Sequence, residues 1–150
     1  RENGMRIGII SGYFNPIHTG HLDYIEAAKK HCDLLYAIVN SDFQVTLKGS
    51  TPFMNQKDRL RIVKALRDVN RVRIAEDEDG TVVKTIQSIY EWNNCDPFVH
   101  SVTFMNGGDR VMGNTPEEQY CYEQGILTLY NVGGGKTESS STLLESVREN

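Results

Sequence analysis

One stretch decides the fold: IGIISGYFNPIHTGHL, which runs from Ile7 to Leu22. Its apolar beginning predicts a buried β-strand, and the chain then turns through Asn15-Pro16, a dipeptide that favours turns. Two histidines, His18 and His21, follow where a helical pattern starts. A helix that begins directly after a strand offers free backbone N–H groups and the positive end of its dipole, which together bind anions. Since the imidazoles add further donors, this stretch predicts a phosphate site.

The rest of the chain alternates strands and helices. We expect four further strands, over 34–39, 71–74, 98–104 and 126–130. We expect helices over 20–31, 56–69, 82–92 and 116–124, and a short last helix from the serine-rich residues 139–142. Residues 40–55 show little periodicity and predict a long loop, and the acidic residues 76–80 predict a solvated turn. The alternation predicts a single α/β domain, a Rossmann-like, doubly wound parallel five-stranded sheet. Ligands bind such sheets at the carboxyl ends of the strands.

Size and composition narrow the class of protein. The 150 residues suffice for one domain, and the net charge of −4 argues against a nucleic-acid binder. No apolar run approaches 18 residues, so no membrane contact is expected. Three widely spaced cysteines predict free thiols and a cytoplasmic protein. Residues 1–5 do not resemble a signal peptide, and we expect them to be disordered or foreign to the natural chain.

The opening stretch also resembles a known signature. Residues 12–21 are similar to the G-x-F-[DN]-x-x-H-x-G-H motif of the nucleotidyltransferase superfamily, which includes cytidylyltransferases and small adenylyltransferases. The resemblance implies transfer of a nucleotidyl group from a nucleoside triphosphate, CTP or ATP, to a small phosphorylated acceptor, with release of pyrophosphate by direct in-line displacement. It implies catalytic roles for His18 and His21. It also implies nucleotide contacts from Gly12, Tyr13, Phe14 and Gly20.

Similarity to the family continues along nearly the whole chain. Residues 40–49 resemble the N-S-D…K-G element of heptose-1-phosphate adenylyltransferases and glycerol-3-phosphate cytidylyltransferases, which implies that Lys48 is catalytic and contacts phosphates. The resemblance assigns Arg59 and Arg67, with Lys48, to the acceptor. Two further segments, similar to the K-G-G-D and serine-rich motifs, imply nucleotide contacts from Gly107, Asp109, Arg110, Ser139, Ser140, Ser141 and Thr142. The resemblance to this family also implies that Mg²⁺ is bound mainly by the triphosphate, with no dedicated protein site, and that the protein forms a homodimer.

Two departures leave the base and the acceptor open. Asn15 stands where cytidylyltransferases usually have Asp, and Asn106 replaces the lysine of K-G-G-D. Length and motif layout favour cytidylyl transfer of the glycerol-3-phosphate type. The alternatives are adenylyl transfer to a sugar phosphate of the heptose-1-phosphate type or to a pyridine mononucleotide. A non-catalytic nucleotide-binding module is an alternative of another class. A synthetase fragment is disfavoured, because the sequence contains no K-M-S-K-S-like segment.

Overall fold

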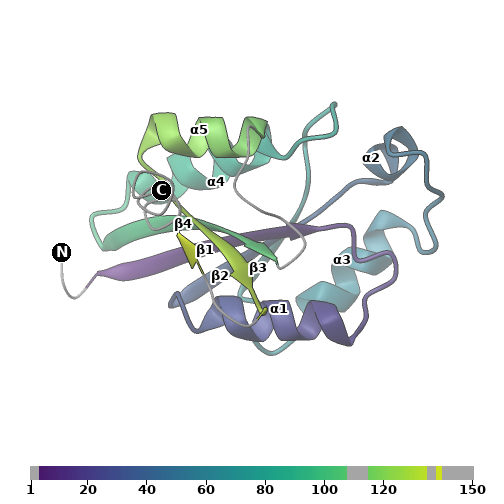
Figure 1. Cartoon of the computed structure of the whole chain (residues 1–150), viewed down its shortest axis with the longest axis horizontal. Helices are drawn as coiled ribbons and strands as arrows, with labels where there is room; N and C mark the ends of the chain where they lie inside the picture. Colours follow the sequence, from purple (N-terminus) through teal and green to yellow (C-terminus); the bar gives the residue numbers. More distant parts are fainter. Residues whose placement is uncertain (1–3, 108–114, 135–137, 140–150) are drawn as a thin grey trace, which may run out of the picture.

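A mostly parallel β-sheet forms the centre of the computed structural model, which describes residues 4–107, 115–134 and 138–139 (Figure 1). Its strands lie in the order β3-β2-β1-β4-β5-β6, and β6 alone pairs antiparallel, with β5. The bounds are β1 Met5–Gly12, β2 Leu34–Val39, β3 Arg71–Ile74, β4 Val99–Gly107, β5 Leu127–Val132 and β6 Glu138–Ser139. Because β1 pairs in parallel with both β2 and β4, its carboxyl end lies at the switch in strand order.

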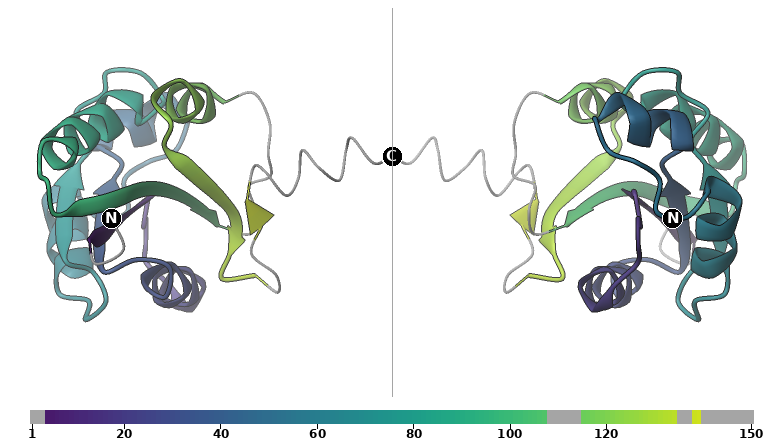
Figure 2. Two further views of the ribbon diagram at one scale, coloured as in Figure 1. Left: turned by 90° about the vertical axis from the view of Figure 1, so that its left-hand side faces the viewer. Right: turned by 90° about the vertical axis from the view of Figure 1, so that its right-hand side faces the viewer.

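Helices cover both faces of this sheet. Figures 1 and 2 show α1 (Thr19–Lys29) and α3 (Gln56–Lys64) on one face and α4 (Val83–Asn94) and α5 (Pro116–Gln124) on the other. The short helix α2 (Asp42–Leu47) lies apart from both layers, beyond the carboxyl end of β2 (Figure 1). The layered arrangement leaves the carboxyl edge of the sheet free to be bordered by loops and helix N-termini.

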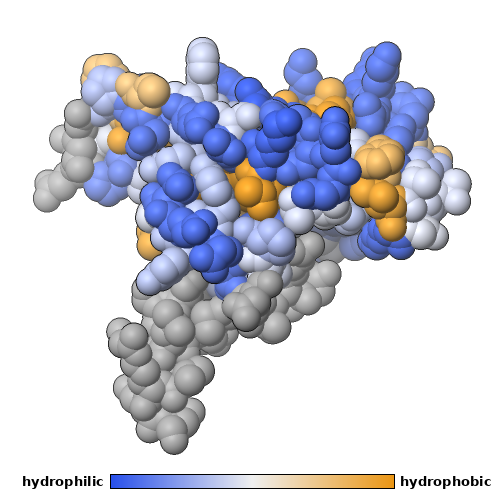
Figure 3. Space-filling model, turned by 90° about the horizontal axis from the view of Figure 1, so that it is seen from above, coloured by the Kyte–Doolittle hydropathy of each residue, from blue (hydrophilic) through white to orange (hydrophobic). Residues whose placement is uncertain are grey.

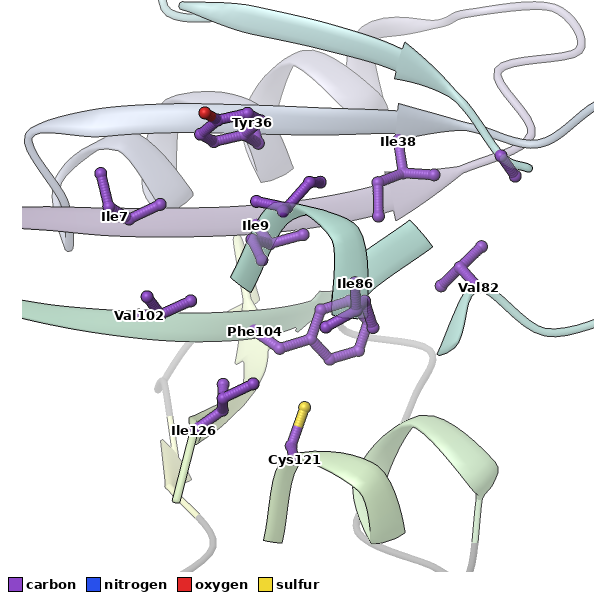
Figure 4. Packing of buried hydrophobic residues seen from close by; sticks show 12 residues of the cluster. Ile7, Ile9, Tyr36, Ile38, Val82, Ile86, Val102, Phe104, Cys121 and Ile126 are labelled. Atoms are coloured by element: carbon purple, nitrogen blue, oxygen red, sulfur yellow. The ribbon is translucent and has the colours of Figure 1, made fainter. Parts of the chain in front are cut away.

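The central strand contributes to a hydrophobic core on each side. Ile7 and Ile9 of β1 pack with Ile86 of α4 and Cys121 of α5 (Figure 4). Ile10 faces the opposite way and packs in the cluster that contains apolar residues of α1. A strand buried on both faces reads as a continuous apolar run, which explains why β1 is visible in the sequence. This double anchoring fixes the loop that follows β1.

The predicted fold class and all five predicted strands are confirmed, and several boundaries differ. The region expected to be a long loop contains α2, a helix of only 6 residues that is capped by Ser41. Helix α3 ends at Lys64 instead of residue 69, and β6 was not predicted. Strand β1 already begins at Met5, within the segment 1–5 that was expected to be disordered or foreign to the natural chain, and residues 1–3 lie outside the described residues. Of the expected last helix, Ser139 belongs to β6, and residues 140–150 lie outside the described residues.

The surface and the cysteines agree with a globular domain. The outer face over α4 and α5 is mostly hydrophilic, with scattered hydrophobic residues (Figure 3). Within the described ranges, no helix has the length and apolar character needed to cross a bilayer. All three cysteines are free, as predicted. Burial raises the pKa of Cys32 to about 11 and that of Cys121 to about 12, so both are poor nucleophiles, whereas Cys95 is exposed.

Candidate active site

A cleft of about 550 Å³ opens at the carboxyl edge of the sheet. On one side it is lined by the loop after β1, by the N-terminus of α1 and by Lys48. The other side consists of Gly80 and Val82 before α4, of Asn106 and Gly107 at the end of β4, and of Glu117 in α5. Its size suits a small-molecule substrate. The cleft therefore lies where the topology predicts a ligand site.

The two histidines hold each other at the start of α1. His18 is the N-cap residue, and its Nδ1 accepts a hydrogen bond from the backbone N–H of Gly20 at 3.1 Å. The Nδ1 of His21 accepts from the backbone N–H of His18 at 3.0 Å, and the two rings stack with centroids 3.9 Å apart. Because both Nδ1 atoms accept, each neutral imidazole carries its proton on Nε2. Both residues line the cleft, so the predicted pair is brought together there as hydrogen-bond donors.

Tight packing fixes this arrangement. Phe14 is buried, has a left-handed backbone conformation (φ 50°), and its ring centroid lies 5.0 Å from that of His21. A Cβ at Gly12 would lie only 3.0 Å from the Phe14 ring, and one at Gly20 would lie 2.9 Å from Cε1 of His18. Gly12 and Gly20 are thus needed because they let the rings of Phe14 and His18, respectively, lie close to the backbone. Gly12, Tyr13, Phe14 and Gly20 all line the cleft, as a nucleotide contact requires.

Lys48 reaches the same cleft from α2. It is exposed, forms the C-cap of the helix, and its Nζ lies 4.1 Å from the ring centroid of Tyr13. This cation–π contact holds the ammonium group beside the loop after β1. Lys48 and the two histidines, far apart in sequence, therefore border one cavity.

Arg59, expected to bind the acceptor, lies elsewhere. Its side chain is buried, with 1% of the residue exposed, and it is absent from the cleft lining. The guanidinium group donates to the carbonyl oxygens of Met54, Tyr13 and Asn40 and forms a 2.7 Å ion pair with Asp42. These contacts join α3 to the loops after β1 and β2. The structure gives Arg59 a positioning role in place of the expected direct contact.

The other predicted residues divide into three groups. Arg67 is exposed and precedes β3, so it lies at the amino edge of the sheet, opposite the cleft, and does not fit the predicted acceptor contact. Gly107 lines the cleft, and Ser139 lies in β6. Five predicted nucleotide contacts fall outside the described residues, namely Asp109, Arg110, Ser140, Ser141 and Thr142.

Asn15 has a role that the motif did not reveal. Its Oδ1 accepts from the backbone N–H of Phe53 at 2.6 Å, and its Nδ2 donates to the carbonyl oxygen of Thr51 at 3.1 Å. The side chain thus ties the loop after β1 to the segment before α3. It uses its donor and its acceptor simultaneously, which an aspartate cannot do when ionised.

We therefore expect Asn15→Asp to lower the free energy of unfolding by about 1 kcal/mol at pH 7, the usual value of one hydrogen bond. The new carboxylate would face the Thr51 carbonyl oxygen, acceptor against acceptor. The loss should shrink near pH 4, where a protonated carboxyl can donate again. Urea unfolding of both proteins at the two pH values measures this, and an equal loss at both would contradict the assigned contact.

Three further residues that shape the site were not predicted. Gln44 is fully buried and donates to the carbonyl oxygens of Asp79 and Thr81, so it fixes the cleft rim at Gly80. Asp77, expected in a solvated turn, is buried and accepts from the backbone N–H groups of Lys84 and Thr85 at the start of α4. Glu117 accepts from the backbone N–H of Val82. The contacts of Gln44 and Glu117 join segments far apart in sequence, so local patterns carry no signal for them beyond the Ser41-to-Gln44 cap. The contacts of Asp77 span only 7 and 8 residues, but its burial depends on tertiary packing.

Comparisons with known proteins agree on one family. A family model described as cytidylyltransferase-like matches residues 9–132. The bifunctional protein HldE of Rhodopseudomonas palustris is 34% identical in strain HaA2 and 38% identical in strain BisB5. In both, the alignment covers 99% of this chain and 28% of the relative, so the chain spans little more than a quarter of their length.

Solved structures share the fold. The lipopolysaccharide core biosynthesis protein of Thermoplasma volcanium superposes with a TM-score of 0.62 at 22% identity, over 82% of this chain and 91% of that one. A putative nicotinate-nucleotide adenylyltransferase of Vibrio parahaemolyticus gives a TM-score of 0.50 at 18% identity, over 96% and 87%. At such identities these structures show a common fold alone.

Proposed function

Because the chain belongs to the cytidylyltransferase-like family of nucleotidyltransferases, we propose that it transfers an adenylyl group from ATP to a sugar phosphate of the heptose-1-phosphate type. The observation that carries the proposal is the similarity to HldE proteins over 99% of the chain. It agrees with the resemblance of residues 40–49 to heptose-1-phosphate adenylyltransferases. The relatives reported above give no support to cytidylyl transfer of the glycerol-3-phosphate type, so the adenylyl alternative takes its place.

The chemistry follows from the donors in the cleft. The triphosphate binds at the N-terminus of α1, where free N–H groups and the helix dipole favour anions. Lys48 and the Nε2–H groups of His18 and His21 donate to the phosphate oxygens and stabilise the charge that develops on the leaving pyrophosphate. An oxygen of the acceptor phosphate attacks the α-phosphorus while the bond to the β-phosphate oxygen breaks. No side chain needs to act as nucleophile.

Magnesium fits this proposal as a companion of the nucleotide. In the described part of the chain, no three His, Cys, Asp or Glu side chains are grouped so as to hold a metal ion. His18, His21 and Lys48, on the side of the cleft at the N-terminus of α1, are hydrogen-bond donors, which suit phosphate oxygens and not a cation. The ion would neutralise phosphate charge and be held by the phosphates. A homodimer and a cytoplasmic location complete the proposal.

A substrate panel tests the activity. ATP, CTP, GTP and UTP are each combined with sugar 1-phosphates, glycerol 3-phosphate and nicotinamide mononucleotide, and pyrophosphate release is measured. We expect the highest kcat/KM for ATP with a sugar 1-phosphate. Turnover of CTP with glycerol 3-phosphate alone would overturn the proposal in favour of cytidylyl transfer. Nucleotide binding without pyrophosphate release from any pair would favour a non-catalytic binding module.

A further inference from the structure

We infer that Glu117 and Asn106 bind hydroxyl groups of the acceptor sugar, on the side of the cleft opposite the histidines. The inference rests on the proposed function and deepens it, because it assigns a subsite and a substrate class: a phosphorylated acceptor with free hydroxyls near its phosphate. It gives Glu117 a direct contact with substrate in addition to its contact with the protein.

Glu117 is a buried carboxylate with one oxygen to spare. The residue is 6% exposed and lines the cleft, and its Oε2 accepts from the backbone N–H of Val82 at 3.1 Å. Its Oε1 has no partner within the described ranges. In the same part of the chain, no fully buried side-chain oxygen or nitrogen lacks a hydrogen bond. Oε1 must therefore be accessible, and the cleft is the space that Glu117 borders.

Asn106 presents a second acceptor. It is 8% exposed, and its Nδ2 donates to the carbonyl oxygen of Leu129 at 3.3 Å. That bond orients the amide, which leaves Oδ1 without a partner among the described residues. Asn106 also lines the cleft. Where the family motif has a cation, this chain thus has an acceptor, on the same side of the cleft as Glu117.

The two ends of the cleft therefore differ in chemistry. The side of the cleft at the N-terminus of α1, called the α1 end, offers N–H donors and the Lys48 ammonium group. The opposite side, with Glu117 and Asn106, is called the α5 end and offers acceptor oxygens and a negative charge. A phosphate at the α5 end would be repelled by the carboxylate. A neutral donor group, such as a hydroxyl, would be bound by it, and hydrogen bonds to charged groups are the stronger ones.

In-line displacement decides which substrate carries that donor. The attacking oxygen and the leaving oxygen lie on opposite sides of the phosphorus. If pyrophosphate leaves toward the N-terminus of α1, the acceptor must approach from the opposite side of the cleft, on the α5 face of the sheet. Helices α1 and α5 lie on opposite faces of the sheet (Figure 2). The acceptor phosphate then sits at the centre of the cleft, and its sugar ring lies toward Glu117 and Asn106.

Glu117→Gln separates substrate binding from the structural contact. The amide oxygen of glutamine can still accept from the Val82 N–H, but the negative charge is lost. With ATP saturating, we expect the KM of the sugar 1-phosphate to rise about tenfold, the equivalent of one charge-assisted hydrogen bond, while the KM of ATP and the unfolding midpoint stay unchanged. Glu123→Gln is the matched control, because Glu123 is exposed on the same helix and does not line the cleft.

Single-deoxy analogues of the sugar 1-phosphate then locate the hydroxyl. One analogue should lose affinity for the wild-type protein and lose no more with Glu117→Gln. A raised KM for ATP would overturn the inference in favour of a contact with the nucleoside, and a lower unfolding midpoint with unchanged KM would reduce Glu117 to its structural contact with Val82.

A binding measurement keeps this test separate from the proposed activity. Calorimetric titration of mannose 1-phosphate onto the protein, saturated with a non-hydrolysable ATP analogue, needs no turnover. Weaker binding to Glu117→Gln than to wild type supports the inference even where no pyrophosphate is released. Equal binding, or none to either protein, overturns it.

Discussion

Replacing Arg59 with methionine is expected to lower the free energy of unfolding by about 3 kcal/mol, the lower end of the usual cost of breaking a buried ion pair. Methionine fills similar space but donates no hydrogen bond. Three carbonyl oxygens, of Tyr13, Asn40 and Met54, would lose their guanidinium donor. The Asp42 carboxylate would lose its partner, although 36% of its side chain remains exposed, which moderates the cost.

Arg61→Met is the matched control, because Arg61 is exposed on the same helix and has no ion pair in the described structure. Its replacement should change stability by less than about 0.5 kcal/mol. Urea unfolding at pH 7 measures both variants. Equal, small effects would mean that the buried contacts of Arg59 do not stabilise the domain, and that the acceptor role expected from sequence similarity must be reconsidered.

Arg59 also shows where sequence reasoning stops. The strand-turn-helix unit from β1 to α1 was predictable because its signals are local: an apolar run, a turn dipeptide and a helix start. An arginine on a helix reads as a solvated charge or a ligand contact, since burial is a tertiary property. The position of Arg67 does not fit the predicted acceptor contact for a related reason: α3 ends at Lys64, and after it the chain lies at the amino ends of the strands, before β3.

The same limit applies to the two sides of the cleft. The side of the cleft that offers hydrogen-bond donors consists of His18, His21 and Lys48. The two histidines are close in sequence, and Lys48 follows the next strand along the chain, so the topology of the sheet is enough to bring them together. The acceptor side depends on how α4 and α5 pack. Glu117 lies in the first turn of α5, where the helix dipole commonly favours an acidic residue, so its sequence context suggests only this helical role. The sequence does not reveal that Val82 lies beside it.

His18→Asn is expected to lower kcat by about 10²- to 10³-fold, the usual cost of removing one donor that stabilises developing charge. Asparagine is among the best N-cap residues, and its side-chain oxygen can replace Nδ1 as the acceptor for the Gly20 N–H. The start of α1 should therefore keep its conformation, and the unfolding midpoint should change no more than it does for a typical surface substitution. What disappears is the Nε2–H donor toward the cleft.

Comparison with His18→Ala separates the two roles of this histidine. Alanine removes the cap as well, so it should cost about 1 kcal/mol of stability in addition to the same loss of kcat. His31→Asn is the control, since His31 is exposed at the far end of α1, away from the cleft. Pyrophosphate release gives kcat for each variant, and urea unfolding gives its stability. If His18→Asn retained full kcat, the histidine would act only as a cap, and the phosphate-binding role of its Nε2–H would be wrong.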